Sequence, residues 1–307
     1  MYHGIINVYK EAGYTSHDVV ARLRGICKQK RIGHTGTLDP DAVGVLPVCL
    51  GNATRLCDML TDRRKEYIAT FRLGVVTDTQ DISGRVLEEK EVTVSSSCVK
   101  EAIMSFVGSS MQVPPMYSAL KVNGKKLYEL AREGKEVERA ARSITIYSIE
   151  ILKDEHPQYS IKVECSKGTY IRTLCHDIGQ MLECGGVMTS LVRTKVGEFD
   201  IEKAYTLDEL QQISDKGNFD QVVLPVEKVF EGYPAFTVKE SSFNAVKNGN
   251  QLKEEDFKEE LVGFSNGTEV TDGIKIRVYS HQNIFFGLYR YEERRKLFSP
   301  VKMFLPQ

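Results

Sequence analysis

Apolar residues recur every three or four positions along residues 16–29, which predicts a helix with one buried side. The apolar positions are Val19, Val20, Leu23, Ile26 and Cys27. Thr15 or Ser16 can cap its start, because a hydroxyl there accepts a hydrogen bond from an unpaired backbone amide. The other side of this helix and the residues after it are basic: Arg22, Arg24, Lys28, Lys30 and Arg31.

Residues 66–74 alternate between apolar and polar, so we expect a strand with Tyr67, Ala69, Phe71 and Leu73 on one face. Residues 143–152 and 159–165 predict two further strands, and a second helix carries Ile171, Leu174, Cys175, Ile178 and Leu182. Helices and strands are interspersed without a regular βαβ rhythm. This pattern predicts an α+β fold with a mixed, largely antiparallel sheet.

The chain is long enough for about two domains at roughly 150 residues each, and it holds 307. A break falls near residues 231–234, and beyond it lie a short helix and strands predicted at 274–280 and 284–291. We therefore expect a catalytic domain over 1–230 and a small β-rich domain over 231–307.

Charge and composition restrict the class of protein. The chain has 41 Lys plus Arg against 42 Asp plus Glu, so it is not a strongly basic binder, although a local basic face remains open. No apolar run reaches the roughly 18 residues of a membrane span, and we expect no secretory signal. The seven cysteines form no Cys-x-x-Cys pair, which favours buried thiols in a reducing cytoplasm over a zinc site.

The most unusual stretch is the glycine-rich run at residues 33–40. Two glycines open backbone conformations closed to other residues, and Pro40 restricts Asp39 to an extended or turn geometry. A fixed loop holding the His34 imidazole and the Asp39 carboxylate is expected. On this chemistry alone, an Asp-Pro turn without catalytic function is the commoner interpretation.

Several motifs together resemble one enzyme family. They are Gly33-His34-Thr35-Gly36-Thr37-Leu38-Asp39-Pro40 with Ala42, Gly44 and Leu46-Pro47 after it, then Lys65-Glu66-Tyr67, Leu73-Gly74 with Thr77-Asp78-Thr79 and Asp81, Pro114-Pro115-Met116-Tyr117-Ser118-Ala119-Leu120-Lys121, and Cys165-Ser166-Lys167-Gly168-Thr169-Tyr170-Ile171-Arg172. In order and spacing they are similar to the bacterial tRNA pseudouridine-55 synthases. The resemblance covers residues 3 to about 225, with Glu11 in place of the family's proline. The tail resembles a PUA-type RNA-binding domain more loosely.

This resemblance implies roles for individual residues. Asp39 is the expected nucleophile, and Arg172 the guanidinium that keeps it charged in a dry pocket. Tyr67 is expected to stack on the uracil and is a candidate general base. His34 matches the histidine that enters the base stack when the target uridine flips out.

RNA phosphates are expected to meet the basic residues of the first helix and a mobile thumb loop at about 115–142. The thumb part from Lys121 to Arg142 has seven basic and four acidic residues. The expected RNA-binding set is His34, Arg22, Arg24, Lys28, Lys30, Arg31, Lys65, Lys121, Lys125 and Lys126. The expected supporting set is Lys10, Gly36, Leu38, Tyr170 and Leu174.

The resulting hypothesis is isomerisation of uridine 55 to pseudouridine in the TΨC stem-loop of tRNA. It involves no cofactor and no metal, no membrane, no obligatory protein partner, a monomer and a cytoplasmic location. The alternatives are a guide-RNA-dependent synthase with the same core and a tRNA-folding chaperone that only binds. A metal-dependent phosphohydrolase built on Asp78 and Asp81 is a remote third, since these acids are expected to shape a turn.

Overall fold

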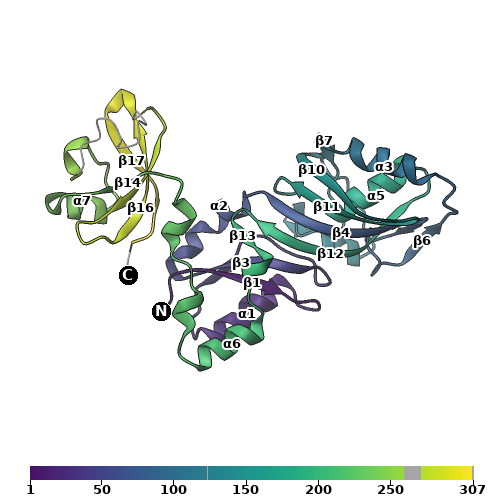
Figure 1. Ribbon diagram of the computed structural model, residues 1–307, viewed down its shortest axis with the longest axis horizontal. Helices are drawn as coiled ribbons and strands as arrows, with labels where there is room; N and C mark the ends of the chain where they lie inside the picture. The colour runs from purple at the N-terminus through teal and green to yellow at the C-terminus, as the bar shows by residue number, and fades with distance from the viewer. Residues whose placement is uncertain (123, 259–270, 306–307) are drawn as a thin grey trace.

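A long mixed sheet organises the first three quarters of the chain (Figure 1). The computed structural model describes residues 1–122, 124–258 and 271–305. Within them the sheet runs β1 (Gly4–Lys10), β3 (Val43–Leu50), β12 (Gly186–Val196), β4 (Lys65–Leu73), β11 (Gln158–Cys165), β10 (Arg142–Glu155) and β7 (Gly108–Gln112), with β2 (Ile32–His34) on β3 and β13 (Phe199–Asp200) on β12. These neighbours are antiparallel except β12 and β3, which confirms the predicted mixed, largely antiparallel sheet.

The parallel seam between β12 and β3 joins the two halves of this sheet. Only two residue pairs form it, Val192 with Val43 and Arg193 with Gly44. Gly44 has a φ of +107°, and a Cβ there would lie 2.2 Å from the Arg193 carbonyl oxygen. The close crossing of the two strands therefore requires glycine at this position.

The α-helices in the described residues are α1 (Ser16–Ile26), α2 (Cys57–Thr61), α3 (Ser96–Ser105), α4 (Leu127–Arg132), α5 (Ile171–Met181), α6 (Leu207–Asp215) and α7 (Phe243–Lys247). Two pairs of them cover different parts of the long sheet. α3 and α5 bury their apolar sides with the Tyr67 face of β4, while α1 and α6 pack with β1 and β3 (Figure 1). The candidate active-site residues come from both regions, since Asp39 precedes β3 and Arg172 lies in α5.

The predicted first helix is correct in place but too long. Thr15 and Asp18 form a capping box that fixes its start. It ends at Ile26, three residues before the predicted end, because Cys27 is the C-cap and Lys28 takes a left-handed φ of 51°. Lys28, Lys30 and Arg31 thus follow the helix and do not lie on its side.

The C-terminal part forms its own four-stranded sheet, as expected. Its order is β14 (Ala235–Thr237), β15 (Lys275–Tyr279), β16 (Phe285–Glu292) and β17 (Leu297–Met303). It packs against the first part through an apolar cluster that joins Phe230, Phe285 and Phe304 to Ile5 and Val45. Part of the expected C-terminal domain, 259–270 and 306–307, lies outside the described residues, as does Asn123 in the expected thumb loop.

The thumb segment contains a short hairpin, β8 (Lys121–Val122) with β9 (Lys125–Lys126), followed by α4. A second small sheet pairs β5 (Val75–Thr77) with β6 (Val86–Glu89). In the part of the chain that the structure describes, no helix is long and apolar enough to cross a membrane.

Candidate active site

The loop between β2 and β3 holds Asp39 in a fixed place. Gly36 takes a φ of +134°, which favours glycine, and the Thr35 hydroxyl donates to the Pro47 carbonyl at 3.1 Å. The Leu38 amide donates to the buried Ser16 hydroxyl at 2.9 Å, so the start of α1 anchors the loop. Leu38 itself is buried in the core below, next to the carboxylate.

Lys10 supports the loop from behind, as expected. Its side chain is fully buried, and its ammonium donates to the carbonyls of Pro40 at 2.9 Å and Glu11 at 3.0 Å. Burial lowers the pKa of Lys10 to about 8, although Asp39 acts in the opposite direction. The Gly13 amide also donates to the Pro40 carbonyl, at 3.0 Å. Together these bonds join the loop after β1, where Glu11 replaces the family's proline, to the loop that carries Asp39.

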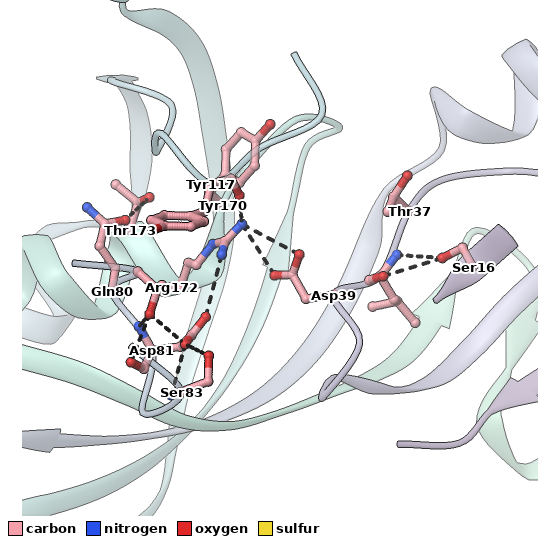
Figure 2. A network of polar contacts seen from close by, with 12 residues as sticks. Ser16, Thr37, Asp39, Gln80, Asp81, Ser83, Tyr117, Tyr170, Arg172 and Thr173 are labelled. Carbon is pink, nitrogen blue, oxygen red and sulfur yellow. Dashed lines mark hydrogen bonds and ion pairs between the residues drawn. The ribbon is translucent and has the colours of Figure 1, made fainter. Parts of the chain in front are cut away.

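Arg172 lies between two carboxylates (Figure 2). Its Nη2 is 3.5 Å from both oxygens of Asp39, and its Nη1 is 3.5 Å from Asp81. The same Nη2 donates to the Tyr117 carbonyl at the start of the thumb segment. The structure therefore brings Asp39 and Arg172 together as predicted, but the guanidinium is shared by three acceptors.

The Asp39 carboxyl faces a partly open space. Its side chain is 40% exposed, whereas that of Arg172 is only 7% exposed. Burial raises the pKa of Asp39 above its ordinary value, and Arg172 offsets part of this increase. The guanidinium thus opposes neutralisation of the carboxyl without fully cancelling the effect of burial.

Asp81 is a site residue that the sequence did not reveal. Its Oδ1 accepts hydrogen bonds from Thr79 at 2.8 Å and from the Ser83 amide at 3.1 Å, which leaves the other oxygen for Arg172. Asp78 does shape a turn as predicted, since it accepts from the Arg85 amide at 2.8 Å. Because Asp81 already pairs with a buried cation, the arrangement does not favour the phosphohydrolase alternative.

Two expected supporting residues flank Arg172. Figure 2 shows the Tyr170 ring beside the guanidinium. The Tyr170 backbone is fixed by a pair of hydrogen bonds with the Gln112 amide side chain, at 2.8 and 3.0 Å. Leu174 is buried one turn below and anchors α5 in the core.

Tyr67 is more deeply buried than a freely accessible stacking residue. It is 9% exposed on the core face of β4. Burial raises the pKa of its hydroxyl, and the charge of Arg193 acts in the opposite direction. Tyr67 and Leu38 of the catalytic loop belong to the same apolar cluster.

His34 lies at the end of β2, beside the start of α1. Its ring meets the His17 ring edge-on, with centroids 5.3 Å apart. The Gly36 amide donates to its Nδ1 at 3.4 Å. Burial lowers the pKa of His34, and the charges of His17 and Arg193 lower it further, which favours the neutral imidazole.

The lysines and arginines expected to meet RNA are exposed, except Lys126, which is half-buried, and Lys65, which is buried. α1 and the turn after it contribute five of them: Arg22, Arg24, Lys28, Lys30 and Arg31. In the described part of the chain, none of these five forms an ion pair. Lys121 and Lys125 are exposed on the thumb hairpin, and Lys126 donates to the Tyr128 hydroxyl at 3.1 Å.

Lys65 is the buried exception, and its expected contact with RNA is contradicted. It is 6% exposed, and its ammonium donates to the carbonyls of Thr61 and Arg63. Burial, and then the charge of Arg193, lower its pKa to about 8. The alternation along β4 explains why Lys65 is buried, because it lies on the same face of the strand as Tyr67.

Comparisons with known proteins place this geometry in a class. Solved structures that match over 99% of the chain include a Cbf5-Nop10-Gar1 complex, with a TM-score of 0.71 and 28% identity over 85% of that chain. Another is an H/ACA RNP bound to a substrate RNA containing 2′-deoxyuridine, with a TM-score of 0.71 and 26% identity over 86% of that chain. Family models define the class, because most of the chain matches domains of pseudouridylate synthases.

Family models narrow the assignment. Residues 24–171 match the N-terminal domain of the TruB family pseudouridylate synthases, and residues 172–231 match the tRNA pseudouridylate synthase B C-terminal domain. The chain belongs to the TruB family. Relatives named tRNA pseudouridine synthase B include one from Lachnoclostridium phytofermentans, 51% identical over 99% of this chain and 100% of its own length. One from Clostridium kluyveri is 44% identical over 98% and 99%.

Proposed function

We propose that this chain converts uridine 55 of the TΨC loop of tRNA to pseudouridine, with Asp39 as the nucleophile. The observation that carries the proposal is the fixed, partly exposed Asp39 carboxylate 3.5 Å from a buried guanidinium. Relatives of 44–51% identity named tRNA pseudouridine synthase B support tRNA as the substrate.

The reaction detaches uracil from C1′ of the ribose, rotates it and reattaches it through C5. An ionised carboxylate is a suitable nucleophile for an anomeric or base carbon. Attack at C1′, attack at C6 and deprotonation toward a glycal are all compatible with the position of Asp39. Arg172 stabilises the ionised form, and Tyr67, below the base, is the candidate for the last proton transfer.

The target uridine must leave the RNA stack before it reaches Asp39, which costs a few kcal/mol. His34, neutral and at the rim of the loop, is placed to enter the space that the base vacates. The exposed basic residues around α1 and the thumb hairpin are suited to hold the phosphates. We assign catalysis to residues 1–230 and a PUA-like RNA-binding role to residues 231–307.

The proposal includes a monomer that needs no protein partner and acts in the cytoplasm. Seven unpaired cysteines support a reducing compartment.

The decisive experiment incubates the purified chain with unmodified tRNA transcript, without metal, and maps pseudouridine by nucleotide position. Product at position 55 is expected. Asp39→Asn should remove turnover while tRNA affinity is nearly unchanged, because the carboxylate acts on the flipped base and not on phosphates. Product at another position, or none, contradicts the proposal, and a collapse of affinity in Asp39→Asn would make Asp39 a structural residue.

A guide-RNA-dependent synthase is the second candidate, since the matching solved structures include RNP complexes. The same experiment separates the two, because a stand-alone enzyme needs no added RNA. Retention of binding without turnover in the wild-type chain would instead favour the chaperone.

A further inference from the structure

A buried arginine that the motifs did not reveal lies directly beneath the catalytic loop. Arg193, on β12, is 1% exposed and is among the largest fully buried side chains. Placing a charged group in the interior is costly unless it is paired or hydrogen-bonded. In the described residues, no carboxylate forms an ion pair with Arg193, so its surroundings must satisfy it in another way.

Backbone carbonyls satisfy this guanidinium. Nε donates to Val45 at 2.7 Å, Nη2 to Gly36 at 3.3 Å and Nη1 to Thr37 at 3.5 Å. Gly36 and Thr37 come directly before Leu38 and Asp39 in the chain. One side chain therefore joins β3 to the segment that positions the nucleophile.

The same guanidinium reaches Tyr67. Arg193 and Tyr67 are paired opposite each other across β12 and β4, so their side chains share a face of the sheet. A register shift follows Arg193 in this pairing, and such a bulge re-aims the side chain next to it. The charge of Arg193 also acts on the Tyr67 hydroxyl and opposes the rise in its pKa that burial causes.

We propose that Arg193 is a positioning residue of the active site, which fixes the carbonyls ahead of Asp39 and the hydroxyl of Tyr67 in one geometry. It touches neither RNA nor the reacting atoms, because it is buried. The inference rests on the proposed function for its catalytic readout. Lysine cannot replace it, because one ammonium cannot reach three carbonyls and a hydroxyl in the planar geometry of a guanidinium.

The test compares Arg193→Lys with wild type in single-turnover reactions on tRNA transcript and in tRNA binding. A misplacement of about 1 Å costs about 100-fold in rate, so we expect a 10- to 100-fold loss of kcat and less than a threefold change in Kd. Arg55→Lys is the matched control, since Arg55 Nη1 also donates to a carbonyl, that of Met303 at 2.8 Å, but follows the end of β3 that is away from the catalytic loop. It should retain kcat within twofold.

A loss of stability alone must be separated from lost positioning. Rates are therefore corrected for the folded fraction, and Arg193→Gln serves as a second variant that leaves no buried unpaired cation. Chains labelled with 3-fluorotyrosine, with the Tyr67 resonance assigned by Tyr67→Phe, give a fluorine NMR readout without turnover. The Tyr67 resonance should move, and its titration midpoint should rise, in Arg193→Gln but not in Arg55→Lys.

The proposal is overturned if Arg193→Lys retains kcat after correction, if its loss lies only in Kd, or if the Tyr67 resonance is unchanged. Should wild type and Arg55→Lys both fail to make pseudouridine, the proposed function fails, and the fluorine NMR readout still decides whether Arg193 positions Tyr67.

Discussion

Asp177 lies one turn beyond Arg172 and Thr173 on α5, and it gives a quantitative test of the electrostatics around this helix. Burial raises the pKa of Asp177 from 3.8 to about 6, with no other cause. No hydrogen bond or ion pair to its carboxylate occurs among the described residues. Ionised Asp177 therefore lowers the free energy of unfolding, whereas a neutral Asn at this position would not.

The sign follows from proton linkage. A carboxyl whose pKa is higher in the folded than in the unfolded chain binds its proton more readily when folded, so stability falls as pH rises from about 4 through 6. The difference between 6 and 3.8 corresponds to at most about 3 kcal/mol above pH 7. Partial exposure of the side chain and burial of the replacing amide reduce this, so Asp177→Asn should raise the free energy of unfolding by about 1 to 2 kcal/mol at pH 7.5.

Urea unfolding followed by circular dichroism at 25 °C, at pH 7.5 and pH 4, measures this difference, provided that the m-value is unchanged. The gain should be present at pH 7.5 and absent at pH 4. Asp220→Asn, at an exposed site, should change neither. An equal gain at both pH values, or none at pH 7.5, would refute the reasoning that burial of the Asp177 charge destabilises the fold.

Three further predictions concern the site. Because the pKa of Asp39 is raised and the nucleophile must be ionised, the single-turnover rate should fall on acidification with a midpoint above 3.8, and a midpoint at or below that value would contradict the role of burial. His34→Ala should slow pseudouridine formation less than Asp39→Asn, because it removes help with base flipping and leaves the chemistry intact; equal losses would show that His34 takes part in the reaction. Removing Lys125 and Lys126 together should lower the slope of log affinity against log salt by about 0.7 to 0.9 for each phosphate that is no longer neutralised, as measured by filter binding, whereas Lys153→Ala, exposed on β10, should leave the slope as it is.

Local patterns predicted much of the fold. Alternation placed Tyr67, Phe71 and their neighbours on the buried face of β4, and Thr15, one of the two predicted caps, is the N-cap of α1. β12 was not predicted. Its apolar positions are interrupted by Arg193 and a bulge, so no simple period marks it.

Only those site residues that lie in a recognisable motif could be predicted from the sequence. Asp39 and Arg172 stood in motifs, and the structure brings them within 3.5 Å. Asp81 resembled a turn residue, because its pairing with Arg172 spans 91 positions and depends on tertiary structure. The alternation along β4 already places Lys65 on the inner face with Tyr67, but the sequence does not reveal the carbonyls that accept from its ammonium.

The shared apolar cluster between the two parts of the molecule limits how the chain can be shortened. A fragment ending at residue 231 would keep Phe230 but lose Phe285 and Phe304, each of which covers roughly 150–250 Å² when buried. The wall formed by Ile5 and Val45 would then face water beside the strands that hold the catalytic loop. Removing the C-terminal part therefore exposes an apolar patch that favours aggregation. A shortened enzyme made from this chain needs polar substitutions at that patch.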